Sequence, residues 1–207
     1  MGFLNRLGHE LPEQGRTLYP KDWTELDTAT VGFGHSIAVT PLHLAAGYAA
    51  LFNGGIHRPP TMLKVGPDHP VAEGTRVFSE DTSYKMRALL RMVVTEGTGR
   101  KADAPGYRVG GKTGTAEKLI NGRYSKRVVV TSFAGVFPMD EPRYVIVVML
   151  DEPKGTADTF GFRTAGWNVA PVVSGTISRI APMLGVRPDE NREPDLASVL
   201  PFLYSEE

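Results

Sequence analysis

The fold depends on one stretch of the sequence, Gly110-Gly111-Lys112-Thr113-Gly114-Thr115-Ala116-Glu117-Lys118. Its small residues and hydroxyl side chains are compatible with an extended strand. Asn121-Gly122 follows almost directly, and this dipeptide is the strongest short hairpin signal that a sequence offers. The pattern therefore predicts a strand over residues 107–118 that turns back into a second strand over 127–137.

A third strand is expected over residues 143–151, after a tight acidic turn at 138–142. Three antiparallel strands packed by flanking helices make an α+β fold class, with an antiparallel β-sheet and no internal repeat. An open sheet of this kind has two unpaired edges. At least one edge is therefore expected to pair with strands outside this sequence.

Three helices are predicted around the strands. Thr40 is a good N-cap and Pro41 suits the first helical position, so one helix is expected from here to residue 52. A second is expected from Ser79 to residue 95, and a third over 168–184 with Pro171 in its first turn. The first thirty residues lack strong periodicity and are predicted to be irregular surface.

The composition excludes several classes of function. Lys plus Arg and Asp plus Glu number 23 each, so no net charge favours nucleic acid or an anionic membrane. The chain has no cysteine, which rules out a disulfide, a thiolate metal site and a thiol nucleophile. Its five histidines show no paired metal spacing. We expect no metal, no cofactor, no nucleic acid partner and no membrane contact by these residues.

Neither a membrane span nor a leader peptide is expected in this sequence. The longest apolar stretch covers residues 144–150, whereas a span needs about 20 residues. Residues 1–14 lack the basic segment followed by an apolar one that marks a signal peptide. Any export or anchoring signal is expected outside these residues.

The triplet Lys112-Thr113-Gly114 recurs by chance in many proteins, and alone it is compatible with an ordinary exposed strand. Its context adds weight, because further motifs precede it in a fixed order. These motifs are Phe33 to Ala45, Asn53-Gly54-Gly55, Arg58-Pro59-Pro60, Glu96-Gly97-Thr98-Gly99 and Gly106-Tyr107. Together they resemble class B penicillin-binding proteins, most closely the septal, cell-division type of monofunctional transpeptidase.

The resemblance implies a fold and a division of the chain. Residues 1–187 would be the C-terminal part of a transpeptidase domain, and residues 188–207 a C-terminal tail. The fold would be an incomplete version of the one shared by penicillin-binding proteins and β-lactamases. The protein would be a bacterial peptidoglycan D,D-transpeptidase for cell-wall synthesis, cell division and cell shape, on the periplasmic face of the inner membrane. Its partners would be stem peptides ending in D-Ala-D-Ala, β-lactam antibiotics and divisome proteins.

The resemblance also implies roles for single residues. Lys112 would be catalytic, helping to pass protons and attracting the substrate carboxylate. Thr113 and Thr115 would donate hydrogen bonds to that carboxylate, and the Thr115 backbone N–H would form half of the oxyanion hole. Gly114 would let the substrate backbone approach closely. Strand alternation places Lys112 and Gly114 on one face and the two threonines on the other, so all four can serve one site only along the strand's edge.

The sequence lacks the nucleophile that this chemistry requires. No serine is followed by lysine three residues later, and no S-x-N triplet is present. In the family both motifs precede the region matched here. We therefore expect the chain to be a truncated or cleaved piece that is inactive alone.

Two other functions share these features. A serine β-lactamase also has a K-T-G strand. A non-catalytic β-lactam sensor or binding module would keep the fold without forming cross-links.

Overall fold

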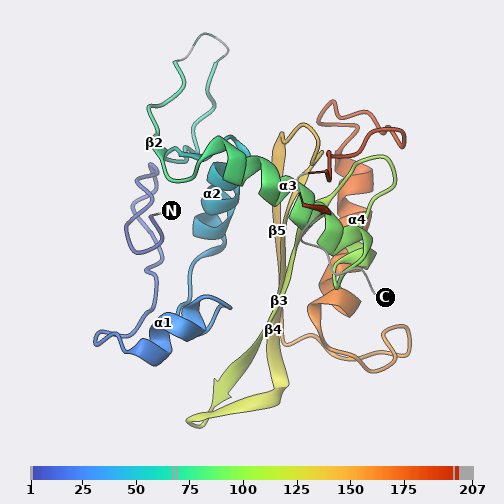
Figure 1. The fold of residues 1–207 in the computed structure, drawn as a ribbon. Helices are drawn as coiled ribbons and strands as arrows, with labels where there is room; N and C mark the ends of the chain where they lie inside the picture. The colour runs from blue at the N-terminus through green and yellow to red at the C-terminus, as the bar shows by residue number, and fades with distance from the viewer. Residues whose placement is uncertain (1, 67, 69, 198, 201–207) are drawn as a thin grey trace.

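The computed structural model describes residues 2–66, 68, 70–197, 199 and 200. Helices cover both faces of a central sheet (Figure 1). The elements, in chain order, are α1 Glu25–Val31, α2 Pro41–Phe52, β1 Ile56–His57, β2 Thr75–Arg76, α3 Glu80–Thr95, the 3₁₀ helix η1 Arg100–Ala102, β3 Gly110–Ile120, β4 Arg123–Phe137, β5 Tyr144–Asp151 and α4 Ala165–Ile180.

The central sheet has three antiparallel strands in the order β3-β4-β5. Asn121 and Gly122 join β3 to β4 with φ angles of 50° and 78°, which a tight two-residue hairpin turn requires. The predicted hairpin is thus confirmed, although β3 continues to Ile120 and β4 already begins at Arg123. Among the described strands, β3 and β5 each have one free edge.

The expected start of the first strand at residue 107 was wrong, because the ladder begins at Gly110. Arg108 has a left-handed φ of 45°, so its backbone departs from the extended strand conformation. Its buried side chain donates from Nε to Asp140 Oδ1 at 2.5 Å. The segment before β3 is therefore held by this ion pair and by the N–H of Met139, which donates to the Arg108 carbonyl oxygen at 2.9 Å.

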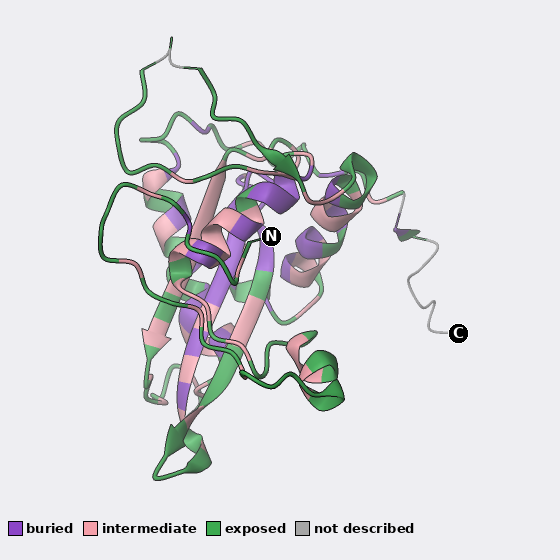
Figure 2. Ribbon diagram, turned by 90° about the vertical axis from the view of Figure 1, so that its left-hand side faces the viewer, coloured by how far each residue is buried: buried purple, intermediate pink, exposed green. Residues whose placement is uncertain are grey.

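Two hydrophobic cores lie on opposite faces of the sheet. One lies between the sheet and α4, and includes Phe133, Val169 and Ile177. The other lies under α2 and α3, and includes Phe52 and Val136. Buried residues accordingly gather where the helices meet the sheet, whereas the β3–β4 hairpin projects beyond them as an exposed ribbon (Figure 2).

The helix α2 confirms the predicted Thr40 cap, and α3 begins at the predicted place, with Ser79 as its N-cap. The Thr40 hydroxyl accepts the N–H of His43 at 3.2 Å, and Pro41 occupies the first turn. The Ser79 hydroxyl accepts the N–H of Thr82 at 3.0 Å. Each cap supplies an acceptor for one of the N–H groups that the first turn of a helix leaves unpaired.

The prediction of irregular surface before residue 31 was wrong, because α1 forms there. Thr24 and Asp27 make a reciprocal capping box in which each side chain bonds the other residue's backbone N–H. None of the helix residues is buried. An exposed helix needs no apolar stripe, which explains the lack of periodicity in its sequence.

The last helix begins earlier than predicted, at Ala165 and not at residue 168. Pro171 therefore lies inside the helix and not in its first turn, which corrects that prediction. A proline here leaves the carbonyl of Trp167 without its helical donor. Pro171 is exposed, so water can supply the missing donor.

The segment after Pro188 packs back on the domain. The N–H of Asp189 donates to the Gly106 carbonyl at 2.8 Å, and Glu193 pairs with Arg91 at 2.6 Å. The division into residues 1–187 and a separate tail stays a prediction. Within the described residues, no helix combines the length and the apolar character that crossing a membrane takes.

Candidate functional site

The predicted site residues lie on β3, an edge strand of the sheet. Lys112 is exposed. Its Nζ donates to the Thr113 carbonyl oxygen at 3.0 Å and to Thr113 Oγ1 at 3.4 Å. The ammonium group therefore bends along the strand toward the hydroxyl of the next residue.

Thr113 and Thr115 face the layer that contains η1 and α4. Thr113 Oγ1 lies 2.9 Å from Thr98 Oγ1, just before η1. Thr115 Oγ1 accepts the backbone N–H of Ala165, the first residue of α4, at 3.1 Å. Three hydroxyl groups thus lie close to the N-terminal end of a helix, where the helix dipole favours negative charge.

Thr115 caps α4 from outside the helix. Thr164 occupies the N-cap position, but its own side chain makes no capping bond. The Thr115 oxygen uses one lone pair for Ala165, so its hydroxyl hydrogen stays available to another acceptor. The residue therefore both stabilises the helix and can donate to a ligand.

The predicted alternation of faces is present in the strand register. Lys112 pairs with Ala134 and Gly114 with Ser132, whereas Thr113 pairs with Phe133, a residue of the core under α4. Lys112 and Thr113 therefore start on opposite faces. Because the lysine side chain turns toward Thr113, the cation and the hydroxyl meet beside the strand.

The neighbours of Gly114 limit the side chain that could replace its hydrogen atom. A β-carbon there would lie 2.8 Å from Ser132 Oγ, too close without a rotation of that serine. Gly111 is more constrained, because its β-carbon would lie 2.5 Å from the Ala134 carbonyl oxygen and 2.6 Å from a ring carbon of Phe133. Packing within the sheet thus requires Gly111, whereas Gly114 faces only a small side chain.

Thr98 lies in the motif Glu96-Gly97-Thr98-Gly99, and the sequence alone predicts no role for it. Its hydroxyl contacts that of Thr113 although 15 residues separate them in the chain. The glycines on both sides of Thr98, Gly97 and Gly99, are the feature of the sequence that indicates a closely packed turn here. Both approach Val93 closely, so a β-carbon at either position would crowd the end of α3.

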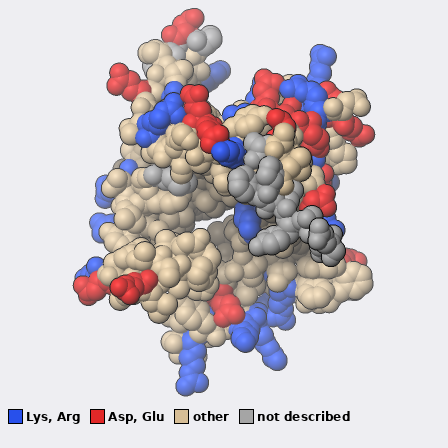
Figure 3. Space-filling view, viewed as in Figure 1, with Lys and Arg blue, Asp and Glu red and all other residues tan. Residues whose placement is uncertain are grey.

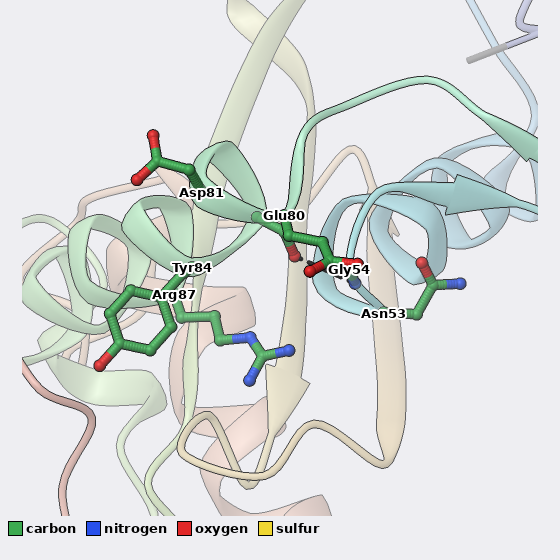
Figure 4. Close-up of a pocket in the computed structure, with 7 residues that line it drawn as sticks. Asn53, Gly54, Glu80, Asp81, Tyr84 and Arg87 are labelled. Carbon is green, nitrogen blue, oxygen red and sulfur yellow. Dashed lines mark hydrogen bonds between the residues drawn. The ribbon is translucent and has the colours of Figure 1, made fainter.

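The described surface is hollowed between the N-terminal part of the chain and the sheet (Figure 3). An open pocket of about 470 Å³ lies elsewhere, between the end of α2 and the start of α3. Figure 4 shows Glu80 beside Gly54 and Asp81 pointing outward. The pocket's serine, Ser83, is only 1% exposed and accepts the Gly54 N–H at 3.2 Å. This pocket offers no accessible nucleophile and contains none of the predicted site residues.

Among the described residues, no group of three or more His, Cys, Asp or Glu side chains is arranged to hold a metal ion. The buried His43 is instead bound within the protein. Its ring nitrogens lie 2.7 Å from Thr40 Oγ1 and 3.0 Å from the Asn5 carbonyl oxygen. It therefore contributes to the start of α2.

Comparison with known families places this geometry in context. Residues 1–171 match the family model described as the penicillin binding protein transpeptidase domain. The chain belongs to this family. The predicted resemblance and the α+β fold class are thereby confirmed.

Individual members of the penicillin-binding transpeptidase family support the match. The chain is 47% identical over 188 residues to a probable peptidoglycan D,D-transpeptidase FtsI of Caulobacter vibrioides, covering 86% of this chain and 32% of that protein. It is 39% identical over 203 residues to the stage V sporulation protein D of Bacillus subtilis, covering 92% and 30% respectively. The chain thus spans about a third of the length of these curated relatives.

Solved structures of the family share the fold. Penicillin-binding protein 3 of Mycobacterium tuberculosis, complexed with aztreonam, matches with a TM-score of 0.78 and 32% identity, over 91% of this chain and 45% of that one. The transpeptidase domain of penicillin-binding protein 3 from Burkholderia pseudomallei matches with a TM-score of 0.78 and 34% identity, over 91% and 56%.

Proposed function

We propose that these residues serve a peptidoglycan D,D-transpeptidase that cross-links stem peptides and is acylated by β-lactams. In that reaction a serine hydroxyl attacks the carbonyl of the penultimate D-Ala and expels the terminal D-Ala. The resulting ester is then transferred to the amine of a second peptide. The relatives named as D,D-transpeptidases and the aztreonam complex of a structural neighbour support this assignment.

One observation carries the proposal: the Lys112 ammonium group turns to Thr113, so cation and hydroxyl share the free edge of β3. A peptide can add to such an edge as a further strand. Its terminal carboxylate would lie near the ammonium group and the hydroxyls of Thr113 and Thr115. The nearby N-terminus of α4 adds favourable electrostatics for the same negative charge.

The backbone of Thr115 has the second proposed role. Backbone groups of alternate residues in a strand point the same way, so Thr115 shares the direction of Thr113. The Thr113 carbonyl is accessible to the Lys112 ammonium group at 3.0 Å. We assign the Thr115 N–H to half of the oxyanion hole, where it would stabilise the negative charge of the tetrahedral intermediate.

The serine nucleophile, its lysine base and the rest of the oxyanion hole are proposed to come from residues outside this sequence. Within the 207 residues no serine precedes a lysine by three positions. Lys112 would then hydrogen-bond the serine of an S-x-N element and help to pass protons. The cell-division role, divisome partners and a periplasmic location at the inner membrane are part of the same proposal, supported by relatives named FtsI.

The proposal is tested by incubating the intact protein with a fluorescent penicillin. We expect one covalent label per molecule, and release of D-Ala from a peptide ending in D-Ala-D-Ala. Lys112→Gln should lower the acylation rate by about 100-fold or more, the usual effect of losing one electrostatic group of an active site. Lys64→Gln, on an exposed loop, serves as the matched control.

Two results would contradict the proposal. One is an acylation rate that Lys112→Gln leaves unchanged. The other is rapid turnover of a chromogenic β-lactam, which would indicate a hydrolase instead. The 207-residue chain by itself should take up no label, and stoichiometric labelling would show that it contains its own nucleophile.

A further inference from the structure

The ladder between β3 and β4 is interrupted by a bulge. Glu117 pairs with Val129, but the next residue, Lys118, pairs with Ser125. Residues 126–128 of β4 therefore have no partner on β3. A bulge bends its strand and redirects side chains, and bulges are common beside functional sites.

The bulge is held in one conformation by bonds to its backbone. The N–H of Arg127 donates to Ser125 Oγ at 3.3 Å, and its carbonyl oxygen accepts from Arg163 Nη1 at 2.6 Å. Arg163 is itself fixed, because its carbonyl oxygen accepts from Asn168 Nδ2 at 2.8 Å. Arg163 lies two residues before Ala165, the helix start that Thr115 caps. The bulge is thus linked to the proposed active-site strand.

The side chains on and beside the bulge are basic and exposed. Within the described residues, Arg123, Lys126 and Arg127 form no ion pair, and neither does the nearby Glu117. Lys and Arg side chains gather at the end of the molecule where the hairpin projects (Figure 3).

The adjacent Lys118 shows that this part of the sheet can neutralise a cation. Its Nζ contacts Glu152 Oε1 at 2.8 Å and Asp151 Oδ1 at 3.0 Å. Hydrogen bonds to Glu152 and Asp151 raise the pKa of Lys118 above its ordinary value. In the part of the chain that the structure describes, Arg123, Lys126 and Arg127 have no such carboxylate partner, so their charges are available to an external anion.

The position of these cations relative to the proposed active site indicates the class of ligand that they would meet. Ile120 lies five positions after Thr115, which is about 17 Å along an extended strand. An antiparallel peptide whose C-terminal carboxylate lies near Thr113 has its preceding residues beside the later part of β3, toward the hairpin. Neighbouring strands are about 4.8 Å apart, so a peptide at the outer edge of β3 lies about 10 Å from β4. A basic side chain on β4 can meet an acidic side chain of that peptide above β3, as Lys118 on β3 meets Asp151 on β5 across β4 at 3.0 Å.

We propose that Arg123, Lys126 and Arg127 form a carboxylate-binding subsite for peptide residues that precede the terminal D-Ala-D-Ala. The subsite rests on the proposed transpeptidase function, and it deepens it by specifying an acidic peptide strand as the substrate class. Exposed charge pairs of this kind act mainly on association and selectivity. The hairpin therefore selects peptides that carry free carboxylates upstream of the reacting bond.

The test uses the intact protein and two fluorescent pentapeptides ending in D-Ala-D-Ala. They differ only in whether the upstream side-chain carboxylates are free acids or amides. We expect the free-acid peptide to bind about five-fold more tightly at low salt, and the difference to shrink at high salt. Lys126→Gln with Arg127→Gln should abolish the preference. Lys64→Gln with Arg179→Gln removes the same charge from exposed sites elsewhere and should preserve it.

Three results would overturn the subsite. The first is equal binding of both peptides to the unaltered protein, and the second is equal loss of preference in the control variant. The third is binding to phosphatidylglycerol vesicles that the bulge substitutions abolish without any peptide preference, which would indicate a membrane surface instead. Penicillin acylation, measured in parallel, reports the transpeptidase assignment independently, because a β-lactam without upstream carboxylates does not use the subsite.

Discussion

Thr115 Oγ1 on β3 accepts the backbone N–H of Ala165 at 3.1 Å, so an edge strand caps the helix that packs behind it. Thr115→Val keeps the shape of the side chain but leaves the buried Ala165 N–H without a partner. We expect a loss of about 1–2 kcal/mol in the free energy of unfolding, measured by urea denaturation. Thr115→Ser should retain most of it. Equal stability of the valine and serine variants would contradict the capping role.

Gly111 is expected to matter for stability, whereas Gly114 is expected to matter for binding. Gly111→Ala places a methyl group against backbone and a buried ring, so we expect a loss of about 1–3 kcal/mol in stability. Gly114→Ala meets only the rotatable Ser132 hydroxyl and should cost less than about 1 kcal/mol. The same variant should slow penicillin acylation of the intact protein. Thermal melts and labelling rates on both variants check the two effects.

Arg108 and Asp140 form a buried ion pair whose side chains are 5% and 9% exposed. Arg108→Met would leave the Asp140 carboxylate buried beside Arg192 alone. Removing one partner of a buried pair costs about 3–5 kcal/mol, and we expect a loss of this size in urea denaturation.

Arg192→Met is the matched control for that pair. Arg192 Nη2 lies 2.7 Å from Asp140 Oδ2, but the two groups are not oriented for a hydrogen bond. The Arg192 side chain is 52% exposed. A pair whose cation is half exposed to water contributes about 0–1 kcal/mol, and Asp140 keeps Arg108 as its partner, so the control should change stability little. Similar losses of unfolding free energy in both variants would contradict a larger contribution from the buried Arg108–Asp140 pair.

Tyr48 is expected to make the free energy of unfolding depend on pH in the alkaline range. Burial against Phe52 and its neighbours raises the pKa of its hydroxyl to about 12, from the ordinary value of 10.0. The unfolded tyrosine therefore ionises first, and between pH 10 and 12 the folded state binds more protons. Stability should be unaffected by this group below pH 10 and fall above it, by up to about 1.4 kcal/mol per pH unit.

Tyr48→Phe removes the ionising group while keeping the ring. The slope of stability against pH between 10 and 12 should flatten in this variant. Urea denaturation at several pH values measures it. An unchanged slope would assign the alkaline sensitivity to another group.

The elements that the sequence predicted well have strong local signals. The Asn121-Gly122 turn, the Thr40 cap and the helix start near Ser79 each depend on a few adjacent residues, and all three are present. The sequence pattern missed α1, because an exposed helix has no apolar stripe and the capping box at Thr24 was the remaining signal. It also missed β1 and β2, which have two residues each and no periodicity.

The geometry of the candidate site depends on contacts between distant residues. The motif indicated Lys112, Thr113 and Thr115, and strand alternation indicated that their side chains begin on different faces. The turn of the Lys112 side chain toward Thr113 and the contact of Thr115 with Ala165, 50 residues away, arise from tertiary packing. No local pattern encodes them. The same holds for the pairing of Arg91 with Glu193, which brings the C-terminal segment onto α3.

The central position of β4 in the sheet protects its backbone from local opening. Its amides lie between two strands, and its side chains contribute alternately to the cores on both faces. Any fluctuation that exposes β4 must therefore separate a neighbouring strand and disturb a hydrophobic layer together. Hydrogen exchange should be slowest along Thr131 to Val136, and the solvent-facing hairpin beyond the bulge should exchange long before the strand to which it is joined.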